Sequence, residues 1–301
     1  MAFDGLAYTG TAGDRVARSR ADPDWIAEQV RRDDTRVIPM WRGRPLLTAD
    51  GQPVGLSGTA ARAVLAEAGQ TALLSVDGLT AVFAADLGDL AETDAVRLAT
   101  AEVTADLRGL ATALPGPVMA TLAYARGLLH WNRHARFCGT CGAPTESAHA
   151  GHLRVCRGCE RQLFPRIEPA VIALVELPGV RPRCLLARHA GSGPDGFSLL
   201  AGFVEIGESL EGAVRREVAE EAGVTVGSVT YQGSQAWPFP AGLMVGFFAA
   251  ATDATIAVDG VELVEARWFT RAEVVDRIVN GPGSGPPDSI GGHLLRSWAG
   301  T

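Results

Sequence analysis

Residues 202–224 read GFVEIGESLEGAVRREVAEEAGV, and this stretch predicts a loop followed by an amphipathic helix. Ser209 is of a residue type that caps helix N-termini, and Gly223 can adopt the left-handed conformation that ends a helix. We therefore expect a helix over residues 209–222. Its apolar positions recur every four residues, which indicates one buried stripe. They are Leu210, Val214 and Val218.

Three carboxylates fall on another face of this predicted helix, because Glu217, Glu220 and Glu221 are spaced i, i+3 and i+4. Like charges at this spacing repel one another, and a merely solvated face would usually intersperse bases. A hard divalent cation removes the conflict, since Mg²⁺ favours carboxylate oxygens and brings substrate phosphates with it. Glu208 and Arg216, eight residues apart, could pair and fix the preceding loop against the helix.

The stretch resembles the Nudix box, because every defined position of that motif is filled. Those positions are Gly202, Glu208, Arg216, Glu217, Val218, Glu220, Glu221, Gly223 and Val224. The resemblance implies an α/β fold, the Nudix α/β/α sandwich with a mixed sheet. It also implies a hydrolase that uses Mg²⁺ or Mn²⁺ to cut nucleoside diphosphates linked to another moiety. The box by itself does not identify the substrate.

The segments on either side of the box agree with an α/β fold, and no internal repeat is visible. After Pro169, strands are expected at residues 171–177, 184–187, 229–235, 243–250 and 267–269. Further helices are expected at residues 272–279 and 289–298, separated by a loop at 281–288. Upstream, strands are expected at residues 37–40, 72–76 and 79–84, with helices at 93–107 and 118–129. The breaker Leu114-Pro115-Gly116-Pro117 separates these two helices.

Four cysteines form two close pairs, Cys138-x-x-Cys141 and Cys156-x-x-Cys159, separated by fourteen residues. This is the spacing of a four-thiolate zinc ribbon, and the short polar segment between the pairs cannot bury a core of its own. We expect one structural Zn²⁺ per chain, with no open coordination position. A redox dithiol and a catalytic zinc are the alternatives.

The other candidate ligands and charges near the cysteines have plainer interpretations. His149 and His152 do not sit at ligand spacings, so both are expected to face solvent. Cys184, inside an apolar strand, is expected to be a buried structural thiol. Residues 126–166 hold seven Arg against two Glu. This basic segment is either a solvated ribbon beside an acidic neighbour or a contact for a phosphate-bearing substrate.

A second motif, residues 234–240 with the sequence SQAWPFP, follows the box. With the zinc ribbon, it resembles the NADH pyrophosphatase branch, whose signature is Ser-Gln-Pro-Trp-Pro-Phe-Pro. The chain departs from that branch at Ala236, where the branch has Pro, and at Gly242, where it usually has Ser. Trp237 and Phe239 between prolines would form a stiff wall for stacking a base or nicotinamide ring. A packed turn over the core is the alternative.

The resemblance implies a role for each candidate site residue. Glu217 and Glu221 would bind the catalytic metal with the backbone carbonyl of Ala201 and with Glu262, for which Glu265 competes. Glu220 would be a further ligand or the general base. Gly202, Glu208, Arg216 and Gly223 would be structural. The substrate would contact Phe164, Phe203, Gln235, Ala236, Trp237, Pro238, Phe239, Pro240, Ala241, Gly242 and Gly291. Phe164 could equally be a core residue.

Length and composition limit the number of domains and the classes of function that are possible. At roughly 150 residues per domain, 301 residues favour more than one domain. We expect an N-terminal α/β domain at 1–125, a zinc ribbon with its connecting helix at 126–166 and the Nudix domain at 167–301. A net charge of −7 makes non-specific duplex DNA binding unfavourable. No stretch approaches the roughly 20 apolar residues of a membrane helix, and residues 1–10 do not read as a secretory signal. We therefore expect a cytoplasmic protein without a membrane partner.

These observations predict an NAD(H) pyrophosphatase that forms nicotinamide mononucleotide and AMP and that could also remove NAD caps from RNA. The branch implies a homodimer. Two alternatives stay open: a Nudix hydrolase of ADP-ribose, coenzyme A or another diphosphate, and a zinc-ribbon regulatory protein with a degenerate Nudix domain. The Ser-Gln-x-Trp motif argues against the first. The intact set Glu217, Glu220 and Glu221 argues against the second.

Overall fold

The computed structural model describes residues 6–10, 13–258, 260–281 and 289–300. The chain divides into two compact units. Unit 1 comprises Met1–Ala7, Ile167–Trp237 and Gly242–Thr301, and unit 2 comprises Tyr8–Arg166 and Pro238–Ala241. Among the described residues, no helix is both long enough and apolar enough to cross a membrane.

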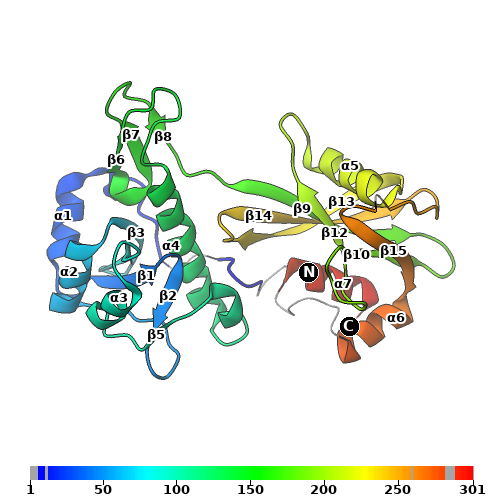
Figure 1. The fold of residues 1–301 in the computed structure, drawn as a ribbon, viewed down its shortest axis with the longest axis horizontal. Helices are drawn as coiled ribbons and strands as arrows, with labels where there is room; N and C mark the ends of the chain where they lie inside the picture. The colour runs from blue at the N-terminus through cyan, green and yellow to red at the C-terminus, as the bar shows by residue number, and fades with distance from the viewer. Residues whose placement is uncertain (1–5, 11–12, 259, 282–288, 301) are drawn as a thin grey trace. The chain divides into compact units, whose positions relative to one another are not determined.

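Unit 1 is built on a mixed sheet (Figure 1). Its strands are β9 (Glu168–Leu177), β10 (Arg183–His189), β11 (Phe197–Ser198), β12 (Leu200–Phe203), β13 (Val226–Trp237), β14 (Gly242–Ala251) and β15 (Leu263–Thr270). The order is β11-β10-β9-β14-β13, with β12 also paired to β9 and β15 to β10. β9 and β14 run parallel, and the other pairs are antiparallel.

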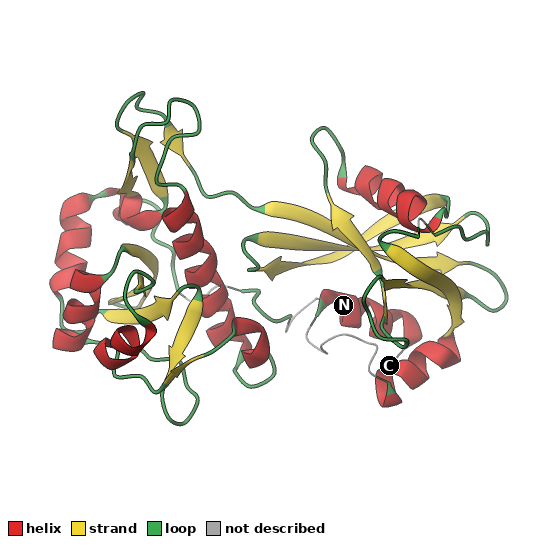
Figure 2. Ribbon diagram, in the orientation of Figure 1, coloured by secondary structure: helices red, strands yellow, loops and turns green. Residues whose placement is uncertain are grey.

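Helices cover both faces of this sheet, which gives three layers (Figure 2). They are α5 (Leu210–Ala222), α6 (Arg271–Asn280) and α7 (Ile290–Ala299). Along β9 the side chains alternate: Val171 and Val175 belong to the core with α5, whereas Leu174 belongs to the core with α6 and α7. This alternation is the period of two that a strand buried on both faces requires. The expected α/β/α sandwich is confirmed.

All the strands expected in this part of the sequence form, with longer bounds than the pattern indicated. β13 begins at Val226 and β15 at Leu263, several residues before the expected starts. The predicted helices at 209–222, 272–279 and 289–298 correspond to α5, α6 and α7. Most of the predicted loop at 281–288 lies outside the described residues.

Unit 2 contains a second mixed sheet and a small three-stranded ribbon. The sheet has the order β3-β4-β1-β2-β5 and consists of β1 (Arg36–Trp41), β2 (Arg44–Leu47), β3 (Gln70–Asp77), β4 (Thr80–Asp86) and β5 (Val103–Thr104). The α-helices are α1 (Pro23–Arg31), α2 (Gly58–Glu67), α3 (Glu92–Leu98) and α4 (Gly116–His134). The short 3-10 helices are η1 (Ser19–Ala21), η2 (Leu107–Leu110) and η3 (His149–Gly151). The ribbon consists of β6 (Thr145–Ala148), β7 (Leu153–Cys156) and β8 (Gln162–Leu163).

The two sheets share a topology. In unit 1 the hairpin β13–β14 places β14 parallel to β9, and in unit 2 the hairpin β3–β4 places β4 parallel to β1. A helix precedes each hairpin in sequence, α5 in unit 1 and α2 in unit 2. The α2 sequence, GTAARAVLAE, contains a single carboxylate, Glu67, at its end. Only the helix of unit 1 therefore carries a clustered acidic face.

The helix expected over residues 93–107 is wrong in its second half. α3 ends at Leu98, and Thr100 adopts a left-handed φ of 50° that turns the chain. Thr104 then pairs with Leu46 of β2 in the short strand β5. Backbone pairing at the sheet edge therefore overrides the helical propensity of the alanine-rich sequence, which is a weak determinant by itself.

The expectation that His152 faces solvent is also wrong, whereas His149 is exposed. The Nε2 atom of His152 lies 2.7 Å from the carbonyl oxygen of Leu73, and its Nδ1 lies 3.0 Å from Nη1 of Arg20. Nε2 must therefore donate to Leu73, and Nδ1 must accept from Arg20. Burial, with a further contribution from Arg20, lowers the pKa of His152 to about 4. The ring is thus neutral and links the sheet of unit 2 to its N-terminal segment.

This geometry predicts a pH-dependent contribution of His152 to stability. In the unfolded chain a histidine binds a proton near pH 6.5, whereas the folded pKa is about 4. The contribution is therefore complete above pH 6.5 and is lost as pH falls toward 4. Relative to His152→Gln, which keeps a neutral side chain, the wild-type free energy of unfolding should fall by about 2 kcal/mol over this range. Partial solvent access of the ring reduces the full linkage effect to this value.

Denaturant unfolding of both proteins at a series of pH values and constant zinc concentration measures the difference. The loss of bound metal and the protonation of carboxylates affect both proteins alike. Parallel stability profiles for the wild type and the variant would show that the ring does not titrate between the two pH limits.

Candidate active site and metal centre

The helix α5 is fixed at both ends as its sequence predicts. The Ser209 hydroxyl accepts a hydrogen bond of 3.0 Å from the backbone N–H of Gly212, and Gly223 ends the helix with a φ of 67°. Val214 and Val218 are buried in the core of unit 1, and Leu210 packs against that core. The predicted apolar stripe is therefore confirmed, and it sets the direction in which the acidic face points.

Arg216 joins the loop before the helix to the helix itself. Its Nε and Nη2 atoms donate to the two carboxylate oxygens of Glu208 at 2.7 and 2.9 Å, and Nη2 also donates to the carbonyl oxygen of Phe203 at 2.9 Å. Glu208 accepts a further bond of 3.0 Å from the N–H of Glu205. The hydrogen bonds from Arg216, followed by the one from Glu205, lower the pKa of Glu208 to about 2. The predicted pairing of Glu208 with Arg216 is confirmed.

The same guanidinium also contacts two carboxylates of the acidic face, which sequence reasoning missed. Nη1 of Arg216 lies 2.9 Å from Glu217 Oε1 and 3.0 Å from Glu220 Oε2. The signal was available, because Glu220 follows Arg216 by four residues, the spacing of a helical ion pair. The positive charge of Arg216 therefore offsets part of the repulsion between these carboxylates. From the sequence alone, we expected a bound metal ion to offset all of it.

The carboxylates of α5 differ sharply in exposure. The side chain of Glu217 is 14% exposed and that of Glu220 is 62% exposed, while Glu221 is buried with an overall exposure of 5%. Burial raises the pKa of Glu217, and Glu220 and Glu262 act in the same direction. Glu262 is therefore close enough to Glu217 for its charge to matter, although the two residues are far apart in sequence.

Gly202 of β12 leaves the space that the Glu217 carboxyl group occupies. A Cβ built at position 202 would overlap the carboxyl carbon and both oxygens of Glu217. The neighbouring Ala201 is half-buried and pairs with Ile172 of β9. The Glu217 carboxyl group thus lies against the backbone of β12, and carboxylate oxygens are donors that a hard divalent cation such as Mg²⁺ prefers. The residues present therefore fit such an ion.

The two candidates for the fourth acidic ligand lie in different surroundings. Glu265 lies on β15 and forms an ion pair of 3.1 Å with Arg188 of β10. Glu262 lies just before β15, where its backbone carbonyl accepts a hydrogen bond from Ala190, and its side chain is exposed.

Phe164 and Phe203 are 54% and 64% exposed, so the alternative that Phe164 is a core residue is wrong. Phe164 borders a recess of about 210 Å³ in unit 2, whose wall also includes Trp131 and Arg166. Phe203 belongs to unit 1 and Phe164 to unit 2. Both rings are therefore available for contact with a ligand.

Residues 235–242 are divided between the units. Gln235 is buried at the end of β13, where its Nε2 donates to Ala7 O at 2.9 Å and its Oε1 accepts from Ile290 N at 2.8 Å. Trp237 is half-buried and ends β13 in unit 1, while Pro238–Ala241 belongs to unit 2. Gln235 thus holds the N-terminal turn of α7 to β13.

The ring of Phe239 is in contact with other side chains of unit 2. It makes an edge contact of 5.5 Å with Tyr8, and the guanidinium groups of Arg108 and Arg126 lie 4.3 and 5.1 Å from its centroid. Gly291, in the first turn of α7, is half-exposed, and a Cβ there would approach Ile172 within 3.1 Å. A larger residue at position 291 would therefore have to displace Ile172.

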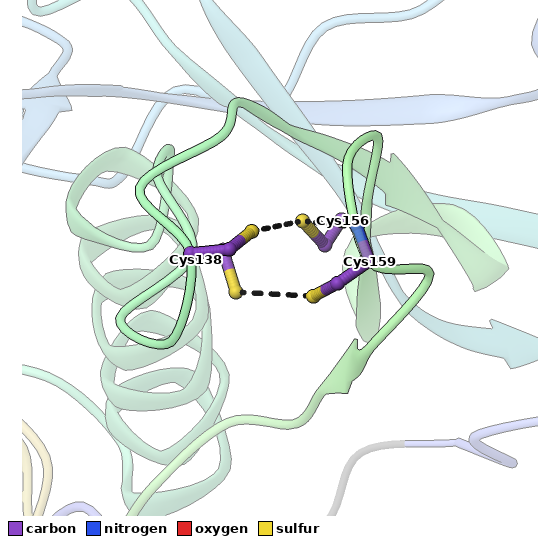
Figure 3. A group of neighbouring side chains, drawn as sticks. Cys138, Cys156 and Cys159 are labelled. Carbon is purple, nitrogen blue, oxygen red and sulfur yellow. Dashed lines mark hydrogen bonds between the residues drawn. The ribbon is translucent and has the colours of Figure 1, made fainter.

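The four cysteines of the ribbon converge (Figure 3). All four sulfur atoms lie within 4.8 Å of one another, and the shortest separations are 3.4 Å between Cys141 and Cys156 and 3.8 Å between Cys138 and Cys159. These separations are too long for disulfide bonds. The N–H groups of Gly158 and Cys159 point at Cys156 Sγ and lower the pKa of that thiol. The cluster fits a tetrahedral, thiolate-bound zinc.

The remaining cysteine and the histidines contribute nothing to this cluster. Cys184 is fully buried on β10, as expected, and burial raises the pKa of its thiol to about 12. Within the described residues, the only group of His, Cys, Asp or Glu side chains that satisfies the geometry of a metal site is the cysteine set. Among these residues, the carboxylates of α5 do not by themselves meet that geometry.

Comparison with known families assigns most of the chain. Residues 166–285 match the NUDIX domain, residues 133–164 match the NADH pyrophosphatase zinc ribbon domain, and residues 34–131 match the NADH pyrophosphatase-like rudimentary NUDIX domain. The last match explains the shared topology of the two sheets. It also corrects the expectation that the chain has no internal repeat, because two NUDIX-type domains are present.

Curated relatives match over part of their length. The NAD-capped RNA hydrolase NudC of Mycobacterium tuberculosis is 44% identical over 204 residues, which cover 64% of this chain and 64% of the relative. The human NAD-capped RNA hydrolase NUDT12 is 40% identical over 189 residues, 59% of this chain and 41% of the relative. The chain therefore spans less than two thirds of these relatives.

A solved structure, a NUDIX hydrolase from Nitrosomonas europaea, is 25% identical and covers 46% of this chain and 79% of its own, with a TM-score of 0.39. The family assignment rests instead on the three matched domains, on the filled Nudix box and on the geometry of α5. Three successive segments of the chain therefore match the domains of the zinc-ribbon-containing NADH pyrophosphatase branch of the Nudix hydrolases.

Proposed function

We propose that this chain hydrolyses the diphosphate of NADH or NAD to nicotinamide mononucleotide and AMP, and the same linkage at the 5′ end of NAD-capped RNA. The observation that carries the proposal is the acidic face of α5, where Glu221 is buried and the Glu217 carboxyl group lies against Gly202 of β12. The names of the relatives and the residue 234–240 motif support the choice of substrate.

In the proposed reaction, water attacks one phosphorus atom, the anhydride P–O bond breaks, and the leaving phosphate takes the electron pair. A bound Mg²⁺ or Mn²⁺ would neutralise phosphate oxygens and stabilise the leaving group. Glu217, Glu221, Glu262 and the carbonyl of Ala201 would hold it. Glu220, the most exposed carboxylate of the α5 set, would be a further ligand or the base that takes the proton from water.

Arg216 has a positioning role in this scheme. Its bonds to Glu208 and to the Phe203 carbonyl hold the loop next to the acidic face, and its contact with Glu217 orients that carboxylate. Gln235 is likewise a positioning residue, because its amide groups are bonded to backbone atoms. Phe164, Phe203, Trp237 and the segment 238–242 would contact the substrate, with Gly291. The homodimer, the cytoplasmic location and the domain boundaries at 125/126 and 166/167 stay predictions.

Incubation with Mg²⁺ and a panel of NADH, NAD, ADP-ribose, coenzyme A and NAD-capped RNA, with identification of the products, tests the proposal. We expect mononucleotide products from the NAD-containing substrates. Glu221→Gln should fold normally and lose turnover by several orders of magnitude, because it removes a negative charge that holds the ion. Glu205→Gln is the control, since that side chain is exposed on the preceding loop.

Two results would contradict the proposal in different ways. Near-wild-type hydrolysis by Glu221→Gln would show that the acidic face of α5 is not the catalytic centre. Faster cleavage of ADP-ribose or coenzyme A than of every NAD-containing substrate would keep the centre but assign another diphosphate.

The cysteine cluster predicts a link between metal content and stability. Zinc binding supplies folding energy to a ribbon that has little core of its own. Cys141→Ser should therefore lower both the bound zinc per chain and the thermal unfolding temperature. Metal analysis and thermal unfolding on the same samples provide the test, with Cys184→Ser as a control that removes a cysteine outside the cluster. Retention of one zinc per chain in Cys141→Ser would contradict the four-cysteine site.

Trp237 provides a test of ring recognition. If it stacks on a substrate ring, Trp237→Ala should lower kcat/KM for NADH by roughly twofold to twelvefold through lost stacking, with lost burial adding to this. ADP-ribose, which has the diphosphate but no nicotinamide ring, should lose much less. Measurement of both substrates with both proteins decides the matter. Equal losses would show that Trp237 does not stack on the nicotinamide ring.

A further inference from the structure

The rudimentary NUDIX domain contains a pocket of about 470 Å³ that the proposed reaction does not use. All the residues that line it belong to unit 2. It lies where the β1–β2 turn and the end of β4 meet α4, and its size is within the range of small-molecule sites. Its charged and polar lining residues are Arg42, Asp86, Asp89, His130, Arg133 and His134, together with Arg126.

One of the three arginines is neutralised within the pocket. Arg133 forms ion pairs of 2.7 Å with the buried Asp86 and 3.1 Å with Asp89. Gly88 permits this arrangement, because a Cβ there would approach the Arg133 guanidinium within 2.6 Å. Arg133 therefore offsets part of the charge of these two carboxylates.

Arg42 and Arg126 form no ion pair within the part of the chain that the structure describes. The half-buried Arg126 donates to the carbonyl oxygens of Gly43 at 2.6 Å and Pro238 at 2.7 Å. Arg42 donates to the carbonyl oxygen of Gly88 at 3.3 Å. The bond to Gly43 ties Arg126 to the turn that carries Arg42, and both arginines line the pocket.

The backbone conformation of the β1–β2 turn is unusual for an arginine. Arg42 and Gly43 form the two-residue turn between β1 and β2 with φ values of 48° and 76°. Such turns favour Asn-Gly or Gly-Gly, because side chains are disfavoured at positive φ. An arginine here accepts backbone strain, which supports a role for its side chain beyond making the turn.

A phosphate monoester complements this arrangement. It carries nearly two negative charges and three acceptor oxygens, so it can bind two guanidinium forks at once. Met40 and Leu129 supply apolar contacts, and the rings of His130 and His134, with centroids 4.1 Å apart, supply flat faces for the uncharged part of the ligand. We infer that this pocket binds a phosphate monoester of about mononucleotide size, with Arg42 and Arg126 as the phosphate-binding side chains.

The histidines give a local readout for the test. The chain has six histidines, two of which line this pocket. In ¹H–¹⁵N spectra of the imidazoles, titration of the full chain with AMP should shift the resonances of His130 and His134 in a saturable way. Inorganic phosphate should shift them more weakly, and adenosine, which lacks the phosphate, should not. The readout needs no catalysis, so it is independent of the proposed reaction.

Arg42→Gln should raise the dissociation constant for AMP by roughly tenfold or more, through the loss of one charged hydrogen-bond donor. Arg97→Gln is the matched control, because that side chain is 80% exposed on α3 of the same unit. Unchanged AMP affinity in Arg42→Gln, no response of His130 and His134 to AMP, or equal binding of adenosine and AMP would each overturn the inference.

Discussion

The guanidinium of Arg216 is the group on which the catalytic half of the molecule depends. It donates to Glu208, to the Phe203 carbonyl and to two carboxylates of the acidic face. In the loop from β12 to α5, Val204 packs against the core of unit 1, whereas Ile206 is fully exposed. Charged hydrogen bonds therefore add to this apolar contact in holding the segment in place. At its start, the Gly202 backbone lies against the Glu217 carboxyl group.

The chain contains the same sheet topology twice, with different chemistry in each copy. In unit 1 the helix before the hairpin presents Glu217, Glu220 and Glu221, whereas α2 of unit 2 ends in a single Glu67. Without clustered carboxylates, α2 cannot hold a divalent cation as α5 is proposed to do. The polar residues of the second copy gather instead between β4 and α4, where Asp86, Arg133 and Arg126 lie at one end of the sheet. A shared fold therefore does not imply a shared site.

The ribbon depends on a different stabilising principle from the two sheets. Its strands are two to four residues long, and only a few of its side chains are buried. One of these is Arg154, which donates to Thr145 and to the Asn132 carbonyl of α4. Thiolate–metal bonds and this polar network together replace the apolar contacts that such a small element cannot provide.

The sequence by itself determined the local features, because each depends on residues that are close together in the chain. The caps of α5, its buried stripe, the Glu208–Arg216 pair and the zinc-ligand spacing all follow from short-range periodicity and residue chemistry. The same holds for most strands of unit 1, whose apolar runs are bounded by turn residues. The fold class follows from the order of these elements, and the Nudix box made that order specific.

Only the tertiary structure decided the features that depend on residues distant in sequence. The pairing of Glu265 with Arg188, the burial of Gln235 and the hydrogen bond of His152 to Leu73 arise from contacts that no local pattern encodes. The helix expected at 93–107 ended early for the same reason, since β5 pairs with a strand more than fifty residues away. The second NUDIX-type domain has no short motif of its own that reveals the repeat, because it keeps the topology of the first without its acidic face. Strand order depends on backbone hydrogen bonds and apolar packing, and many different sequences can provide these. A metal site requires particular ligand residues at particular positions, and few sequences provide those.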